Sequence, residues 1–96
     1  MKNKEDIIQI IKNLHNELKR YKVREIGIFG SVVRDEQKRS SDIDVLVDFE
    51  DNADLFDLVG LGLFLEERLG SKVDVVPRKA LRSELKDTVL KEVVPA

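Results

Sequence analysis

Residues 41–49, Ser-Asp-Ile-Asp-Val-Leu-Val-Asp-Phe, decide the fold of this chain. Every second residue from Ile43 to Phe49 is apolar, and Asp fills most of the positions between them. This period of two is typical of a β-strand with one buried face. Asp42 and Asp44 then lie on the other face, about 6.6 Å apart along the strand. The stretch therefore predicts a strand that holds two carboxylates on the face away from the core.

A second predicted strand, Val23–Phe29, ends at a glycine that begins a polar turn. Gly30 has no Cβ, so its backbone can approach a phosphate closely. Ser31 adds a hydroxyl and a backbone N–H at the start of a short predicted helix. Arg34 follows one turn later on the same side, and its guanidinium can bind phosphate oxygens. An ordinary Gly-Ser turn with a surface arginine is the alternative interpretation, and residues 35–41 are predicted to form a polar loop.

Three segments have the apolar spacing of amphipathic helices, and a third strand precedes the last of them. The predicted spans are a helix over Lys4–Lys19, a helix between Asp54 and Gly70, a strand over Lys72–Val76 and a helix over Ala80–Val93. The apolar residues expected on the buried sides of the helices are Ile7, Ile8, Ile11, Leu14 and Leu18, then Leu55, Leu58, Val59, Leu65 and Leu69, and last Leu81, Leu85 and Val89. The resulting order, α-β-α-β-α-β-α, predicts an α/β (α+β) fold.

The length and composition restrict the class of protein. A chain of 96 residues predicts one domain, spanning 1–96. Its residues are 42% hydrophobic and 38% charged, with a net charge of −2, so no overall basic field favours nucleic acid. The absence of cysteine excludes disulfides and thiolate metal sites. Neither a signal peptide nor an apolar run long enough to cross a membrane is visible, which predicts a cytoplasmic protein.

Asp74 lies between two valines in the third predicted strand, so it faces the side opposite to them. If this strand neighbours the strand of Asp42 and Asp44, the three carboxylates share one surface. Three carboxylates about 5 Å apart repel by roughly 3 kcal/mol per pair at an effective dielectric constant near 20, so a cation or a proton must offset the charge. Magnesium prefers such oxygen ligands. The alternatives are an exposed strand face and chance, because random placement of the Asp residues yields roughly one Asp-x-Asp.

The combination of Gly30-Ser31-x-x-Arg34, Asp42-Ile43-Asp44 and Val73-Asp74-Val75 resembles the minimal nucleotidyltransferases of the DNA polymerase β superfamily. The resemblance extends from the first strand to the last helix. It implies a nucleotidyltransferase-like fold, with a small mixed sheet flanked by helices. It also implies transfer of a nucleoside monophosphate, in particular AMP from ATP, to a protein hydroxyl. Family members of this length are commonly the antitoxin of a pair whose toxin is a HEPN-domain RNase.

The resemblance assigns a role to each residue of the combination. It implies that Gly30-Ser31 holds the triphosphate of ATP or another NTP and that Arg34 steadies the phosphate charge. Asp42 and Asp44 are the implied ligands of magnesium, with two ions in the site. Asp74 is implied to bind the second ion and to help deprotonate the acceptor hydroxyl. Two ions about 3.5–4 Å apart can clamp the attacking and leaving oxygens of an in-line displacement.

One departure from the family pattern lies directly after Arg34. The family usually has Gly at the next position, and this chain has Asp35 and then Glu36. The two carboxylates add negative charge near a site for an anion. They either point away from it, beside Lys38 and Arg39, or weaken catalysis.

Three functions are compatible with these residues. The first is a magnesium-dependent nucleotidyltransferase that modifies a protein. The second is a noncatalytic antitoxin that neutralises its partner by binding alone. The third, addition of nucleotides to RNA, ranks last because the chain is small and its net charge is unlike that of an RNA-binding protein. The small size also predicts that a partner chain, or a second copy in a homo-oligomer, completes the acceptor site.

Overall fold

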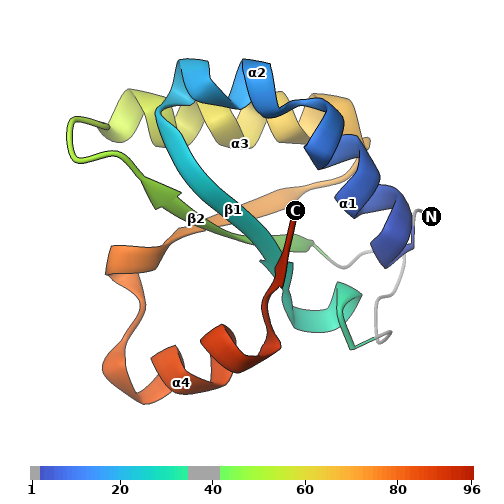
Figure 1. The fold of residues 1–96 in the computed structure, drawn as a ribbon, viewed down its shortest axis with the longest axis vertical. Coiled ribbons are helices and arrows are strands. Elements are labelled where there is room, and N and C mark those ends of the chain that lie inside the picture. The colour runs from blue at the N-terminus through green and yellow to red at the C-terminus, as the bar shows by residue number, and fades with distance from the viewer. Residues whose placement is uncertain (1–2, 35–41) are drawn as a thin grey trace.

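The computed structural model describes residues 3–34 and 42–96 (Figure 1). Its helices and strands, in chain order, are α1 (Lys4–Asn13), α2 (His15–Leu18), β1 (Val23–Phe29), β2 (Ile43–Phe49), α3 (Leu55–Leu69), β3 (Val73–Pro77), α4 (Ser83–Glu92) and β4 (Val94–Pro95). Single 3-10 turns lie at Lys19–Tyr21, Gly30–Val32 and Arg78–Ala80. None of the helices in the described ranges is both long and apolar enough to span a membrane.

The strands form one mixed sheet in the order β3-β2-β1-β4. β2 pairs antiparallel with β1 and parallel with β3, and β4 pairs antiparallel with β1 at the edge. The predicted mixed sheet with flanking helices is therefore confirmed. In this register Asp44 is opposite Phe29 on one side and opposite Asp74 on the other. The end of β1 and the starts of β2 and β3 consequently meet at one end of the sheet.

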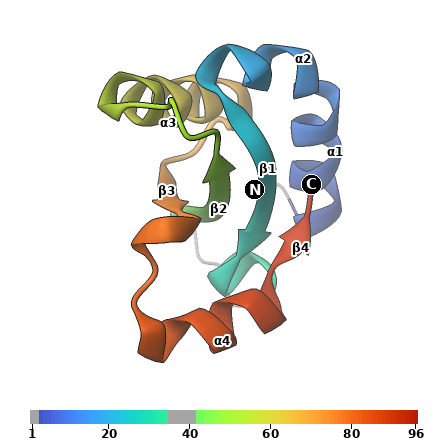
Figure 2. The ribbon, with the colours of Figure 1, turned by 60° about the vertical axis from the view of Figure 1, so that its left-hand side comes forward.

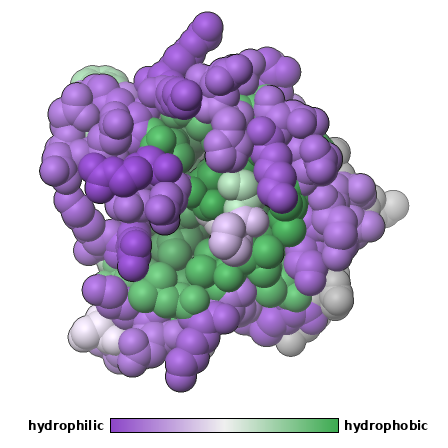
Figure 3. Space-filling view, in the orientation of Figure 1, coloured by the Kyte–Doolittle hydropathy of each residue, from purple (hydrophilic) through white to green (hydrophobic). Residues whose placement is uncertain are grey.

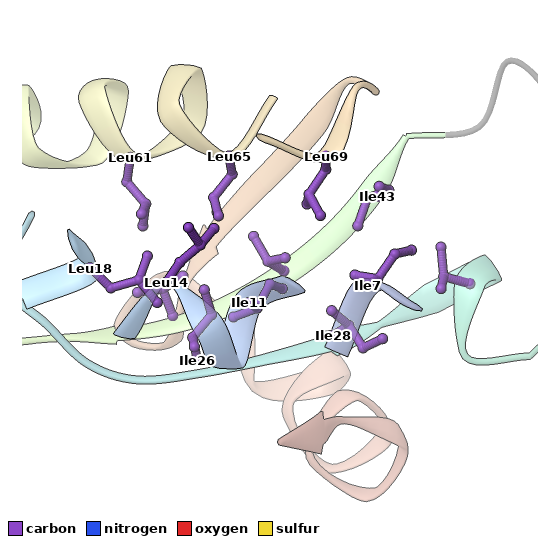
Figure 4. Packing of buried hydrophobic residues seen from close by; sticks show 13 residues of the cluster. Ile7, Ile11, Leu14, Leu18, Ile26, Ile28, Ile43, Leu61, Leu65 and Leu69 are labelled. Carbon is purple, nitrogen blue, oxygen red and sulfur yellow. The ribbon is translucent and has the colours of Figure 1, made fainter. Parts of the chain in front are cut away.

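Helices α1, α2 and α3 cover one face of the sheet, and the core lies between them (Figures 1 and 4). The buried residues of α1 and α3 face each other and the sheet in Figure 4. The core consists of Ile7, Ile11, Leu14, Leu18, Ile26, Ile28, Val32, Ile43, Val45, Val47, Leu61, Leu65 and Leu69. Helix α4 lies apart from the other helices, beside the 3-10 turn that follows β1 (Figure 2). The face of β2 that carries Asp44 is thus the face away from α1 and α3.

The buried side of α3 differs from the predicted one. Leu65 and Leu69 are buried as expected, but Leu55 and Val59 are 69% and 53% exposed. Leu61 faces the core in their place. The helix is apolar on more than one side, so periodicity alone could not select the stripe that packs on the sheet. The predicted ends are confirmed: Asp54 caps the N-terminus with Asp57 in a capping box, and the helix ends at Gly70.

Two other helices also differ from their predicted spans. The first predicted helix is interrupted at Leu14, and no Gly or Pro marks the break in the sequence. The last helix begins at Ser83 because the residues before it form a 3-10 turn. Leu85 is predicted to face inward, but its side chain is 51% exposed in the structure. Strand β4 was not predicted, since two residues are too short to display a period.

Candidate functional site

The three predicted carboxylates lie together at one end of the open sheet face. Asp44 and Asp74 are direct partners in the parallel ladder between β2 and β3, so their side chains leave the sheet on the same face. Asp42 lies just before β2, and its carboxylate is near enough to Asp44 to raise the pKa of that residue. Asp44 is half-buried, whereas Asp42 and Asp74 are exposed. The condition under which Asp74 was expected to share this surface, that its strand lies beside β2, is met.

The electrostatics single out Asp44 within this group. Its pKa is raised above the ordinary range, first by burial and then by repulsion from Asp74 and Asp42. The guanidinium of Arg34 acts in the opposite direction, and the carboxylate of Glu92 adds to the rise. The ionised form of Asp44 therefore costs free energy in the folded protein, and a bound cation would remove that cost.

Asp44→Asn is expected to increase the free energy of unfolding of the metal-free protein at pH 7, because the neutral amide avoids the cost of the ionised carboxylate. In a domain of this size, each 1 kcal/mol of such an increase raises Tm by about 4–8 °C. The sign follows from the raised folded-state pKa of Asp44. The penalty is absent well below the unfolded-state pKa of about 3.9, where the carboxyl is protonated in both states, grows as pH rises from there, and is complete above the folded-state pKa. Thermal unfolding in EDTA, from pH 4 to pH 7, measures the difference.

Asp48→Asn is the matched control, because Asp48 lies on the same strand and face but pairs with Arg24 at 3.9 Å. This variant should gain no stability. Added magnesium should raise the Tm of the wild type and leave that of Asp44→Asn unchanged, since a ligand of the folded state stabilises it by mass action. Equal stability of wild type and Asp44→Asn at pH 7 would contradict a penalty on ionised Asp44.

The predicted phosphate turn contacts Asp44 directly. Gly30 has φ +79°, and a Cβ added to it would overlap Oδ2 of Asp44. The backbone N–H groups of Val33 and Arg34 both donate to the carbonyl of Gly30, at 3.1 and 3.2 Å, and close a tight turn. The helix expected after Ser31 is a single 3-10 turn, so this turn offers individual backbone N–H groups and no long-helix dipole. Asp35 and Glu36 lie outside the described residues.

A fourth acidic residue, Glu92 at the end of α4, reaches this turn. Its Oε1 accepts hydrogen bonds from the backbone N–H of Gly30 at 3.2 Å and from Nη1 of Arg34 at 2.7 Å. Sequence reasoning missed Glu92, which is 62 residues from Gly30 along the chain. The one available signal was weak: an acidic residue in the last turn of a helix opposes the helix dipole and needs a partner.

The donor set suits a hard divalent cation. Asp44 and Asp74 present carboxylate oxygens from neighbouring strands, and the pKa of Asp44 is raised. Oxygen ligands of this kind suit magnesium. Within residues 3–34 and 42–96, no three histidines or carboxylates are close enough to enclose an ion by themselves. Magnesium is commonly held by one or two carboxylates, with substrate phosphates and water as the other ligands. The residues therefore fit an open magnesium site that a bound nucleotide would complete.

The structure also has a groove of about 490 Å³, whose lining contains none of these carboxylates. It lies between β1 and the C-terminal segment, and its lining includes Leu46, Leu90 and Val93. Figure 3 shows an apolar hollow at the centre of this face, surrounded by hydrophilic residues. The lining includes neither Asp44 nor Asp74, so the candidate site is the open end of the sheet and not this groove.

Comparison with known proteins gives consistent results. The family model described as "Nucleotidyltransferase domain" matches residues 10–95. The protein adenylyltransferase MntA of Thermococcus cleftensis is 47% identical over 91 residues, which cover 94% of this chain and 92% of that protein. A solved structure assigned as a minimal nucleotidyltransferase has 34% identity and a TM-score of 0.86, and the match covers 99% of this chain and 97% of the other.

A further solved structure is a toxin–antitoxin complex. It contains a tri-AMPylated HEPN toxin from Shewanella oneidensis together with an MNT antitoxin. The match has 26% identity and a TM-score of 0.64, and it covers 91% of this chain and 69% of the other. The arrangement of strands and helices described above is therefore similar to that of proteins crystallised in such complexes.

Proposed function

The chain belongs to the nucleotidyltransferase domain family, and on that premise we propose that it is a magnesium-dependent protein adenylyltransferase. It transfers AMP from ATP to a hydroxyl group of a partner protein, a HEPN-type toxin that the reaction neutralises. The adenylyltransferase relative and the AMPylated toxin in the neighbouring complex support this choice of reaction and partner. In this chain, the observation that carries the proposal is the register of Asp44 with Asp74 beside the Gly30 turn.

Nucleotidyltransferases generally use a divalent metal ion, and the ion proposed for this site is magnesium. Asp42 and Asp44 would hold it, and Asp74 would bind a second ion. Two ions so held would supply Lewis-acid stabilisation to the attacking and leaving oxygens. The burial of Asp44 among other carboxylates makes its charge costly without a cation, so the site favours metal binding over an empty state at neutral pH.

The protein residues position the reactants around the α-phosphorus of ATP. Gly30 and Ser31 bind the β- and γ-phosphates through the turn, and Arg34 offsets part of their negative charge. The acceptor hydroxyl oxygen forms a bond to the α-phosphorus as the bond to the bridging oxygen breaks, and pyrophosphate leaves. Asp74 takes up the proton of the acceptor hydroxyl. Positioning and charge stabilisation thus supply the catalysis, as in other phosphoryl-transfer sites.

Incubation with ATP, magnesium and the protein encoded by the neighbouring gene, which the proposal expects to be a HEPN-type toxin, tests the proposal. ATP labelled on the α-phosphate should label the partner protein, whereas ATP labelled on the γ-phosphate should not, because pyrophosphate leaves. EDTA should abolish labelling. One pyrophosphate should be released for each AMP transferred. Labelling from γ-labelled ATP would indicate a kinase, and stable binding of an unlabelled partner would indicate a noncatalytic antitoxin.

A further inference from the structure

The carboxylate of Glu92 links three parts of the structure: the end of α4, the turn after β1 and the side chain of Arg34. A single oxygen, Oε1, accepts from both the Gly30 N–H and Arg34 Nη1, at 3.2 and 2.7 Å. The side chain of Glu92 is only 17% exposed. The bond to Arg34 has the length of a strong charge-assisted hydrogen bond. The carboxylate therefore fixes the spacing between a backbone donor of the turn and the guanidinium.

The segment directly after Glu92 holds it in place. Val94 and Pro95 pair with β1 opposite Ile28 and Gly27, and the Ala96 N–H donates to the carbonyl of Ile26 at 3.0 Å. A Cβ at Gly27 would lie 2.7 Å from Cγ2 of Val93 and 2.9 Å from the Val94 carbonyl oxygen. The missing side chain of Gly27 thus lets the C-terminal segment approach β1. Figures 1 and 2 show this segment beside β1, with α4 next to the turn.

The negative charge of Glu92 is unfavourable at this position unless hydrogen-bond donors offset it. A carboxylate in the last turn of a helix opposes the helix dipole, and this one also raises the pKa of Asp44. The two donors offset that cost. The bond to Glu92 also holds the long side chain of Arg34 beside the carboxylates, where its guanidinium acts to lower the pKa of Asp44. A guanidinium has five N–H donors, and such a group can bind a carboxylate and a phosphate at the same time.

We propose that Glu92 is a positioning residue for ATP binding: it orients Arg34 and the Gly30 turn so that both meet the triphosphate. This inference rests on the proposed function, because it assumes that the turn and Arg34 bind the nucleotide. Glu92 itself touches neither the substrate nor the reacting atoms. Its effect on activity should therefore pass through Arg34 and appear in the affinity for ATP more than in the chemical step.

Four variants test this inference: Glu92→Ala, Glu92→Gln, Arg34→Ala and the double variant Arg34→Ala/Glu92→Ala. Glu92→Ala should raise the Kd for magnesium–ATP and the KM for ATP about tenfold, with kcat changed less than about threefold. Glu92→Gln should recover most of the affinity, because its amide oxygen can accept the same two hydrogen bonds. In the Arg34→Ala background, the loss of Glu92 should change the Kd less than about twofold, since residues that act as a unit are not additive.

Asp87→Ala is the matched control, because it removes an equal charge from an exposed position of the same helix and should leave the Kd unchanged. Tighter ATP binding by Glu92→Ala would overturn the inference, because the carboxylate would then compete with the triphosphate. The inference would also be overturned if the effects of Arg34→Ala and Glu92→Ala on the Kd multiplied in the double variant. Failure of the wild type to bind ATP would overturn it as well. Calorimetric ATP binding separates the two proposals: coupled binding without AMP transfer would support this inference and refute the proposed function.

Discussion

Replacing Asp42 and Asp44 together with Asn is expected to lower the rate of AMP transfer at least about 1000-fold. Both substitutions remove an anionic ligand from a site where metal ions stabilise the charge that develops in the transition state. The amide side chains have nearly the same size, so the β2 register with β1 and β3 should persist. Partner binding is expected to persist as well, because both substitutions keep the size and shape of the side chains.

Transfer of α-labelled AMP under single-turnover conditions measures the loss, and co-purification of the partner measures binding. Asp48→Asn controls for a general effect of removing a carboxylate from β2, and it should transfer AMP at nearly the wild-type rate. Melting of the double variant in EDTA should be no lower than that of the wild type, because like-charge repulsion has been removed. A double variant that transfers AMP as fast as the wild type would exclude the two carboxylates from catalysis.

The sequence was sufficient for the parts of the site that local patterns encode. The alternation around Asp44 predicts both the strand and the face on which the carboxylate lies. The valines on either side of Asp74 do the same for β3. That the two strands are neighbours could only be assumed, because a strand pattern shows which face is buried and not which strand lies alongside. The parallel register between Asp44 and Asp74 therefore had to come from the structure.

The features that the sequence did not reveal depend on contacts between distant segments. Leu55 and Leu61 are equally apolar members of one helix, and only packing against the sheet buries the second and leaves the first exposed. In the sequence, Glu92 is one more charged residue of an amphipathic helix. The two-residue strand β4 after it brings α4 to the Gly30 turn, and this contact is visible only in the structure. Such close approach of backbone segments leaves no periodic signal in the chain.

Gly30→Ala is expected to disable the site and to destabilise the protein by about 2–3 kcal/mol. The backbone of Gly30 has φ +79°, in the left-handed region, where a residue with a Cβ costs about 1–2 kcal/mol. The new methyl group would also overlap Oδ2 of Asp44 and lie 3.1 Å from its Cγ. Either the carboxylate or the turn must move, and each movement separates the phosphate donors from the metal ligands. We expect AMP transfer to fall about 100-fold.

Gly62→Ala provides a control of opposite sign. Among the described residues, a Cβ there would meet Val75 Cγ2 alone, at an ordinary 3.7 Å, and alanine in a helix interior is favoured by about 0.5–1 kcal/mol. Urea unfolding of both variants should therefore give changes of opposite direction. Gly30→Ala should also cost less in an Asp44→Ala background, because the overlap with the carboxylate is gone and the backbone strain remains. An undiminished cost in that background would show that contact with Asp44 is not what requires glycine at this position.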